Sequence, residues 1–283
     1  YAPPMSAPDP EPQTGGLPYA LGAYTIWGLL PLYLLLVQTV PAVEFVGWRI
    51  LWTVPVCLIV VAFRSQGAEV RAALTSPAIL RTMLLSSVLI AINWLTYIYA
   101  VLDGKVYGAS LGYYLNPLVN VLLGTMLLGE RLTRRQWIAV ALAAIGVSLL
   151  AAGALTTLWI SLTLALSFGS YGLIRKQVAV GAVPGLTIES TLLLVPSFGV
   201  ALYYAQTEGS SFAVSTELSL AIMAGGAFTA FPLLLFAIAA RKLPYSTLGF
   251  IQFLAPSIVF ILGLTVFGEE LKPAQAACFA CIW

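Results

Sequence analysis

The chain has 283 residues, of which 60% are hydrophobic and 8% are charged, with a formal net charge of +2 and no histidine. Soluble globular domains carry about 25% charged residues because their surfaces must be wetted, so this composition excludes a soluble protein. Neither a nucleic-acid footprint nor an imidazole-based active site is indicated.

The first 16 residues are rich in proline, glycine and small polar residues. They lack the basic start and apolar centre of a signal peptide, so residues 1–16 are predicted to form a disordered N-terminal tail. The chain begins without methionine and stops at Trp283, within an apolar run. We therefore expect the native protein to be longer and its tenth helix to be truncated here.

Ten apolar segments follow the tail. A helix needs about 20 apolar residues to cross a bilayer, since each residue rises about 1.5 Å. Five spans are expected near 17–38, 43–63, 78–101, 106–128 and 135–153, and five more near 156–175, 185–206, 218–240, 244–267 and from 274 onward. The predicted fold class is an all-α polytopic membrane protein with ten transmembrane helices.

The two sets of five spans resemble each other. Residues 27–55 align without gaps to residues 168–196, and a second block aligns Pro117, Gly129, Glu130, Leu132 and Gln136 with Pro256, Gly268, Glu269, Leu271 and Gln275. The predicted domains are therefore repeats at 17–153 and 154–283. Because each repeat has an odd number of spans, the second must insert upside down, as in many secondary transporters.

The basic residues fall mainly in alternate loops. One set of loops holds ten of them and the other set holds two: Arg64, Arg71, Arg81, Arg131, Arg134, Arg135, Arg175, Lys176, Arg241 and Lys242 against Lys105 and Lys272. Cytoplasmic loops are enriched in Lys and Arg, so both termini are predicted to lie in the cytoplasm. Arg175 and Lys176 are interpreted mainly as such topology signals.

Several segments resemble the RarD (chloramphenicol-sensitive) proteins, of the EamA branch of the drug/metabolite transporter superfamily. They are NWLTYIYAV at 93–101, ASLGYYLNPLVNVLLG at 109–124, LGERL at 128–132, SYGLIRKQVAV at 170–180 and STLGFIQFLAP at 246–256. The resemblance runs from about Leu17 to Trp283. It implies a ten-helix permease of the bacterial cytoplasmic membrane, with a central cavity, and relatives that export amino acids and other small metabolites. Many RarD relatives have histidine where this chain has Trp48, so no proton-relay role is carried over.

Polar side chains within the spans are the candidate substrate-binding residues. Asn116 and Asn120 are four residues apart and share a helix face with Tyr113. A buried amide bonds either to a neighbouring helix or to a solute in a cavity, and both interpretations stay open. Gln252 is the repeat equivalent of Tyr113. Asn93 shares a face with Tyr97, and we expect Asn93, Asn116 and Gln252 to face one polar cavity.

Arg49 is the basic residue placed well inside a predicted span. A lone guanidinium in the bilayer core costs about 2.5–3.5 kcal/mol even on permissive scales. Arg49 therefore snorkels outward, pairs with a carboxylate such as Asp103 or Glu269, or holds a substrate anion. Glu44, five residues away, is expected on a different helix face.

Glu44, Glu189 and Tyr171 are the candidates for coupling or gating. Glu189 begins a span, where the helix dipole stabilises a carboxylate, or it titrates within an inner vestibule. The three cysteines, at 57, 278 and 281, are interpreted as compact apolar residues. No metal site, cofactor or catalytic residue is predicted.

The function predicted from these residues is a secondary transporter that exports small organic, amino-acid-like or drug-like solutes by alternating access. The alternatives are a channel-like facilitator and a non-transporting scaffold. An enzyme is disfavoured because the chain has no histidine, no clustered carboxylate pair and no phosphate loop. The expected partners are a small solute and the lipid bilayer, not nucleic acid. The oligomeric state stays open, a monomer included, as does proton coupling against facilitated diffusion.

Overall fold

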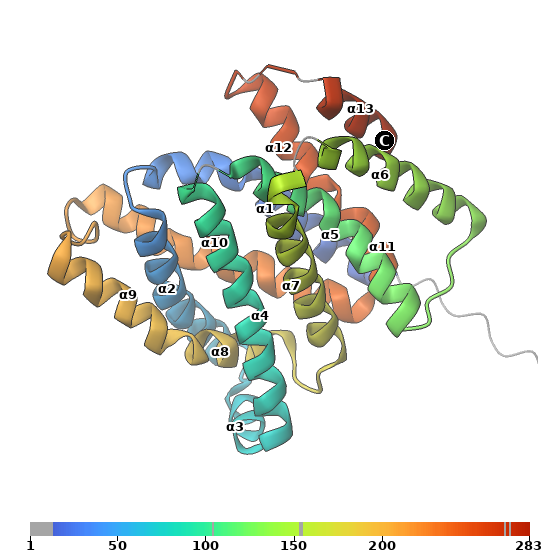
Figure 1. Ribbon diagram of the computed structural model, residues 1–283. Helices are drawn as coiled ribbons and strands as arrows, with labels where there is room; N and C mark the ends of the chain where they lie inside the picture. The colour runs from blue at the N-terminus through green and yellow to red at the C-terminus, as the bar shows by residue number, and fades with distance from the viewer. Residues whose placement is uncertain (1–13, 104, 153–154, 269, 272) are drawn as a thin grey trace, which may run out of the picture.

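The computed structural model of the chain describes residues 14–103, 105–152, 155–268, 270–271 and 273–283, and all regular elements within them are helices (Figure 1). The first half holds η1 (Thr14–Gly16), α1 (Leu17–Leu34), η2 (Leu35–Val37), α2 (Ala42–Phe63), α3 (Gly67–Thr75), α4 (Pro77–Leu102), α5 (Val106–Leu127) and α6 (Arg134–Ala152). The second holds η3 (Leu155–Thr157), α7 (Leu158–Gln177), α8 (Ala182–Leu192), α9 (Leu194–Thr207), α10 (Thr216–Lys242), α11 (Tyr245–Gln252), α12 (Leu254–Thr265) and α13 (Pro273–Ile282).

Most of these helices are suited to a bilayer. In the described residues seven helical segments are long and apolar enough to cross it, or eight when the bent pair α8–α9 counts as one span. The all-α membrane fold is thus confirmed. The expected fourth and tenth spans, α5 and α13, fall outside that set, so the count of ten stays a prediction.

Three features differ from the simple pattern of ten spans. The expected tail ends in a 3-10 turn over 14–16, while residues 1–13 lie outside the described residues. An additional helix, α3, connects α2 to α4, and two expected spans are interrupted, at Leu193 and at Phe253. Each interruption lies three residues before a proline, Pro196 or Pro256. Proline has no N–H for the carbonyl four residues earlier, which weakens the helix at that point.

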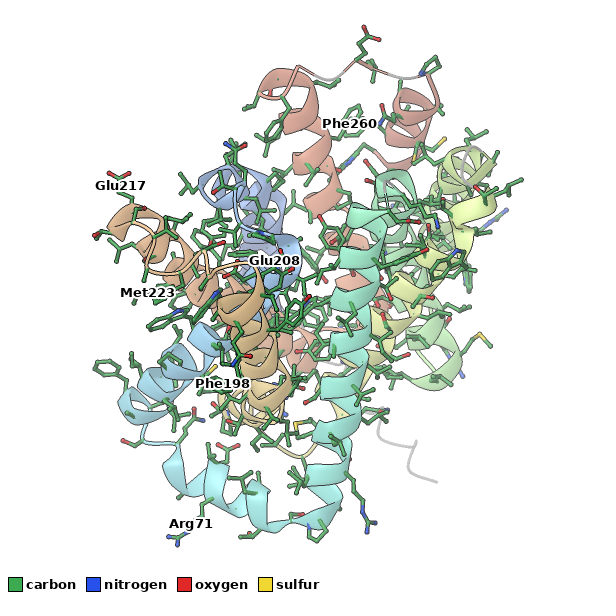
Figure 2. The ribbon with its side chains drawn as sticks, turned by 60° about the vertical axis from the view of Figure 1, so that its left-hand side comes forward. Arg71, Phe198, Glu208, Glu217, Met223 and Phe260 are labelled. Carbon is green, nitrogen blue, oxygen red and sulfur yellow. The ribbon has the colours of Figure 1, made fainter. Side chains whose placement is uncertain are left out.

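The loops rich in arginine and lysine gather at one end, which we call the basic end. Three contacts between them place them together: Gly181 N–H donates to Glu69 Oε1 at 2.8 Å, Arg241 Nη1 to Val178 O at 3.1 Å, and Ser246 N–H to Glu130 Oε2 at 2.8 Å. Figure 2 shows Arg71 at this end and Glu217 at the other, which we call the opposite end.

The two halves are packed in an exchanged manner. Helix α1 contacts α10 and α12 of the second half, while α7 contacts α4 and α5 of the first. In the repeat alignment α1 corresponds to α7, α4 to α10 and α5 to α11–α12, so equivalent helices have equivalent neighbours in the other half. This is the pattern that a two-fold axis between the halves produces. The inverted repeat is consistent with it and stays a prediction.

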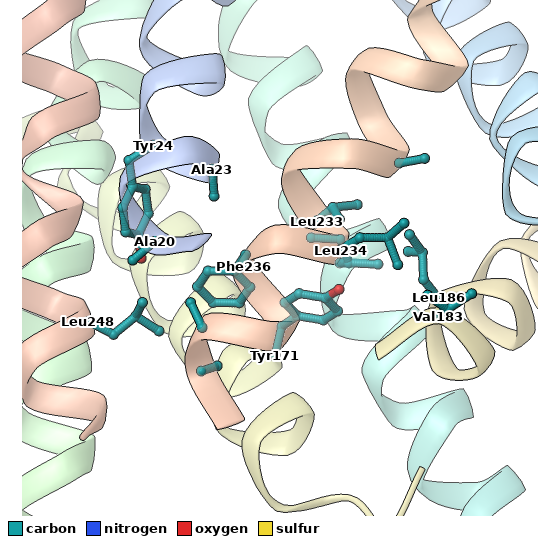
Figure 3. Packing of buried hydrophobic residues seen from close by; sticks show 14 of the residues in the cluster. Ala20, Ala23, Tyr24, Tyr171, Val183, Leu186, Leu233, Leu234, Phe236 and Leu248 are labelled. Atoms are coloured by element: carbon teal, nitrogen blue, oxygen red, sulfur yellow. The ribbon is translucent and has the colours of Figure 1, made fainter. Parts of the chain in front are cut away.

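An aromatic core joins the halves near the basic end (Figure 3). The rings of Tyr171 and Phe236 stack with centroids 6.3 Å apart, and Phe168 packs on Phe236 at 5.2 Å. Tyr24 of α1 contacts the same ring edge-on at 6.4 Å. All four side chains are buried, so α1, α7 and α10 are held together mainly by close packing, as is usual between helices in lipid.

Candidate functional site

A small cavity lies at the centre of the bundle. Its volume is about 10 Å³, which is room for about one water molecule. Helices α2 and α4 of the first half and α7, α8 and α10 of the second supply its lining, which consists of Ile50, Thr53, Ile90, Trp94, Tyr171, Leu186, Glu189, Ser190, Leu193, Thr229 and Leu233. A space this small, lined by both halves, is too small for an organic solute in this arrangement.

Towards the opposite end lie several aromatic side chains, which we call the aromatic cluster and define as Tyr33, Trp48, Trp94, Phe212 and Phe228. Two of its pairs are stacked, Trp48 on Phe212 with centroids 4.6 Å apart and Tyr33 on Phe228 at 4.3 Å. Trp94 belongs both to this cluster and to the cavity lining. Tyr33 is buried and Phe228 is 39% exposed, so this pair reaches from the interior of the bundle to its surface.

Arg49 lies against the aromatic cluster. Its guanidinium carbon is 4.8 Å from the centre of the Trp94 ring, a cation–π contact, and its buried Nε has no hydrogen-bond partner within the described residues. Tyr113, Tyr33 and Tyr97 are close enough to interact with its charge.

The carboxylates suggested as partners of Arg49 are engaged elsewhere or lie outside the described residues. Asp103 is 2.6 Å from Lys105 Nζ, and this hydrogen bond lowers the pKa of Asp103. Glu44 bonds to other groups, and Glu269 lies outside the described residues. Within the described part of the chain, then, no ion pair neutralises Arg49.

Glu44 anchors the loop between α9 and α10 at the opposite end by hydrogen bonds. Its carboxylate accepts hydrogen bonds from Ser211 N–H at 2.8 Å, Ser211 Oγ at 2.6 Å, Ser210 Oγ at 3.2 Å and Trp48 Nε1 at 3.0 Å. The side chain is fully buried, so these four donors compensate its lost hydration. Glu44 thereby fixes the α9–α10 loop over the aromatic cluster.

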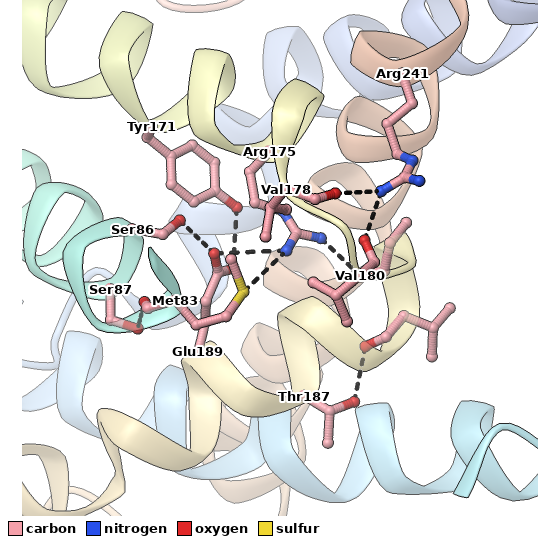
Figure 4. A network of polar contacts seen from close by, with 12 residues as sticks. Met83, Ser86, Ser87, Tyr171, Arg175, Val178, Val180, Thr187, Glu189 and Arg241 are labelled. Carbon is pink, nitrogen blue, oxygen red and sulfur yellow. Dashed lines mark hydrogen bonds and ion pairs between the residues drawn. The ribbon is translucent and has the colours of Figure 1, made fainter. Parts of the chain in front are cut away.

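A buried charge network lies on the other side of the cavity (Figure 4). Arg175 Nη1 is 3.7 Å from Glu189 Oε1, and the two side chains are only 1% and 3% exposed. Ser86 of α4 donates a hydrogen bond to Glu189 Oε1, and Tyr171 donates to Oε2 at 3.3 Å. Arg175 Nη2 also donates to the carbonyl of Ala182 at 2.8 Å. Glu189 therefore joins α4, α7 and α8 while it lines the cavity.

The turn between α7 and α8, residues 178–181, is held by charged side chains from three elements. We call this set the turn clamp: Glu69, Arg175 and Arg241. Arg241 Nη1 donates to Val178 O at 3.1 Å and to Val180 O at 2.5 Å, and Glu69 accepts from Gly181 N–H. Interpreting Arg175 mainly as a topology signal missed this role. Its position four residues after Tyr171, on one helix face, was the available signal.

The amides predicted to share one cavity do not line it in this arrangement. Asn93 Nδ2 donates to Leu164 O at 2.9 Å and to Ser167 Oγ at 3.1 Å, both on α7. Asn120 Nδ2 donates to Gln252 Oε1 at 2.6 Å, which joins α5 to α11. These contacts are of the helix–helix kind. A role for these residues with solute in another conformation stays a prediction.

Asn116 is also buried, at 3% exposed. Its Oδ1, like that of Asn120, has no hydrogen-bond partner among the described residues. The predicted aromatic members lie beside Arg49 rather than beside the amides. Tyr97 and Tyr113 meet edge to face with centroids 6.0 Å apart, and Tyr113 is 45% exposed.

Comparison with known proteins identifies the family. Residues 14–152 match the EamA-like transporter family. An uncharacterized transporter of Pseudomonas aeruginosa is 44% identical, over 94% of this chain and 90% of its own length. The protein RarD of Streptomyces exfoliatus is 40% identical, over 96% of this chain and 86% of its own, and that of Escherichia coli is 39% identical, over 95% and 91%.

The fold also has a counterpart among solved structures. One crystal structure superposes with a TM-score of 0.75 at 20% sequence identity, covering 96% of this chain and 95% of that chain. At that identity the likeness concerns the fold alone. The match to the transporter family, the RarD relatives and the long apolar helices show a multi-pass membrane protein with bacterial homologues. The chain therefore belongs to the EamA-like transporter family, in the group of the RarD proteins.

Proposed function

We propose that the chain is a secondary transporter that moves small, amino-acid-like or drug-like organic solutes out across the bacterial cytoplasmic membrane. The observation that carries the proposal is the small cavity that both halves line, with buried charged groups next to it. In alternating access, one cover opens while the other stays closed, so the same site faces each side in turn.

The contacts that cover the cavity are of a kind that can break and re-form. On one side they are the aromatic cluster and the loop held by Glu44, and on the other they are the buried network of Glu189 and the turn clamp. A channel-like facilitator would instead have a continuous polar path. The sequence shows neither a ring of like charges nor a carbonyl filter, and this favours the carrier over the channel.

The charges suggest the chemistry of the solute. Arg175 and Glu189 balance each other, whereas Arg49 has no described carboxylate partner. The acid group of a solute would supply the missing negative charge, and the planar guanidinium suits a carboxylate. The basic end is assigned to the cytoplasm because basic loops stay on that side, which puts both termini there.

The test is transport by the purified protein in liposomes, with labelled amino acids and amphenicols offered with and without a pH gradient. We expect uptake of at least one solute by the wild type and strong impairment in Arg49→Ala. Arg49→Lys should restore it only partly, since one ammonium cannot reproduce a two-pronged contact with a carboxylate.

A matched control is Arg71→Ala, which removes an exposed arginine at the basic end and should transport as the wild type does. Full activity in Arg49→Ala would mean that the guanidinium only snorkels to the headgroups, and the assignment of a solute anion to Arg49 would be rejected.

A further inference from the structure

Glu189 belongs to two arrangements at once. Its side chain lines the central cavity, and its carboxylate also holds Arg175, Ser86 and Tyr171. We propose that Glu189 is the proton-binding coupling group of the transporter. When it is ionised it keeps the basic end closed, and when it is protonated it releases Arg175 and the basic end opens. This inference rests on the transport function proposed above.

The charges around Glu189 decide what a proton does there. Helix α7 presents Tyr171 and Arg175 to it, α4 presents Ser86, and α2 presents the thiol of Cys57. Helix α10 lines the cavity with Thr229 and Leu233, neither of which is charged. Glu69 of α3 accepts a hydrogen bond from Gly181 N–H, in the turn before α8, and is not among the residues that line the cavity. Among the described residues, then, Arg175 is the one full charge that faces Glu189.

Proton binding breaks this balance. A hydronium ion in the cavity gives its proton to a Glu189 oxygen, an O–H bond forms, and the carboxylate becomes a neutral acid while water is left behind. Arg175 keeps its positive charge and is then buried without a counter-charge, which is strongly unfavourable in a low-dielectric interior. Arg175 lies two residues before the end of α7, at the basic end. Its way back to water is therefore short, and it leads out of the basic end.

The position of the guanidinium makes its departure an opening step. A Cβ placed on Gly185 of α8 would lie 2.0 Å from Arg175 Nη1, so the guanidinium lies directly against the backbone of α8. Its Nη2 also holds the Ala182 carbonyl at the start of that helix. When the Arg175 side chain moves out, Ala182 loses its hydrogen bond and the space between α7 and the start of α8 is no longer filled. Of the turn clamp, Glu69 and Arg241 then remain.

The consequence is an exchange of solute for proton. The protonated carrier opens at the basic end, where Glu189 meets water and gives up its proton while solute binds. The ionised carboxylate then re-forms its pair with Arg175 and closes that end. With the basic end in the cytoplasm, each proton that enters accompanies a solute that leaves, so a proton gradient drives export.

The native thiol of Cys57 provides a direct readout. Cys57 is fully buried on α2, where it neighbours Ser190 and Thr187 on the same side of the cavity as Glu189. With Cys278 and Cys281 replaced by alanine, N-ethylmaleimide reacts with Cys57 only when this region opens. At one fixed pH, we expect Glu189→Gln, which imitates the protonated acid, to be labelled several-fold faster than the parent.

Two further variants test whether the effect is specific to Glu189 and whether it depends on Arg175. Glu44→Gln makes the same change in the buried carboxylate at the opposite end and should not speed the labelling of Cys57. Gly185→Ala displaces Arg175 by its added methyl group and should speed labelling even though Glu189 is retained. Size-exclusion profiles and melting temperatures in detergent establish that each variant is folded. If Glu189→Gln does not fold, Gly185→Ala and the pH series of the parent decide the matter.

The pH series separates proton binding from thiol chemistry. The ratio of the parent labelling rate to that of Glu189→Gln cancels the pH dependence of the thiol itself. We expect this ratio to rise towards one as the pH falls. A ratio that does not change with pH, or equal labelling of the two proteins throughout, would overturn the proposal. Where Glu189→Gln is not available, Gly185→Ala replaces it as the reference, with the same two outcomes.

Failure of the coupling proposal and failure of the transport proposal give different results. A wild type that carries solute in liposomes but shows a flat ratio is a transporter in which Glu189 does not bind the coupling proton. A wild type that carries none of the offered solutes, whatever its labelling, speaks against the proposed function itself.

Discussion

At the scale of single residues, two buried arginines have different surroundings. Arg175 has Glu189 at 3.7 Å and the Ala182 carbonyl at 2.8 Å, whereas Arg49 has the Trp94 ring and tyrosines. A guanidinium at membrane depth costs about 2.5–3.5 kcal/mol on permissive scales, and a cation–π contact returns about 0.5–2 kcal/mol. The contacts of Arg175 are thus explained by this structure, whereas the proposed solute carboxylate would explain the retention of Arg49.

The two asparagines of α5 provide a prediction at this scale. Asn120→Ala removes the 2.6 Å bond to Gln252 and should lower stability by about 0.6 kcal/mol and at most about 1.7 kcal/mol. Asn116→Ala removes an oxygen without a described partner, so folded yield should be unchanged while transport falls. Melting temperature in detergent and liposome uptake measure the two effects. If the yield of Asn116→Ala falls together with its transport, Asn116 only joins helices.

Sequence reasoning selected individual polar residues, but their grouping depends on contacts between helices that it could not supply. Arg49, Glu189 and Tyr171 were chosen because charge and hydroxyl groups are costly in an apolar span, and all three lie at or beside the cavity. In this arrangement Asn93 and Gln252 contact different helices, and their grouping around a solute stays a prediction. Helical periodicity gives the face of a side chain, but not the neighbouring helix that the face meets. Asn93 turned out to contact α7.

At the scale of elements, the repeated Gly–Glu pair has a physical explanation. Gly129 and Gly268 both have positive φ, 67° and 66°, just after α5 and α12. This conformation ends a helix and is easily adopted only by glycine. After the first turn, Glu130 accepts hydrogen bonds from Tyr245 N–H at 2.5 Å and Ser246 N–H at 2.8 Å. It thus caps α11 from the other half of the chain, a contact that no local pattern predicts.

Close helix contacts give a second prediction. A Cβ on Gly226 of α10 would lie 2.4 Å from the backbone carbon of Trp52 in α2, whereas one on Gly199 of α9 would meet nothing within 4 Å. Gly226→Ala should therefore separate α10 from α2 and destabilise the fold by about 1–3 kcal/mol. Gly199→Ala is the matched control and should be neutral or slightly stabilising. Thermal unfolding in detergent compares them, and equal melting temperatures would contradict the described contact.

At the scale of the whole molecule, composition was sufficient to predict the class of fold. A chain with 8% charged residues has to place its surface in lipid, and the described residues form helices suited to a bilayer. The distribution of arginine and lysine predicted which loops lie together, and contacts such as that between Glu69 and Gly181 agree. The breaks at Leu193 and Phe253 were less predictable, because proline permits a break without requiring one.

Closure of both ends over one small cavity is the basis of the proposed mechanism. The Glu44 contacts cover the site on one side, and the Glu189 network with the turn clamp covers it on the other. A carrier built in this way moves one solute for each change of conformation. A channel-like facilitator would let solutes pass without such a change. The two predict different behaviour when labelled and unlabelled solute are present on opposite sides of a membrane.

Counterflow in liposomes tests this central claim most directly. Vesicles containing the protein are loaded with an unlabelled solute that it carries, and then diluted into a trace of the labelled form. A carrier that alternates between two closed ends should accumulate label above its external concentration for a time, because outgoing unlabelled solute returns the site to the outside. Alternating access with Arg49 in the solute site predicts that transient peak in the wild type and its loss in Arg49→Ala. Label that rises only to equilibrium, without a peak, would contradict alternating access.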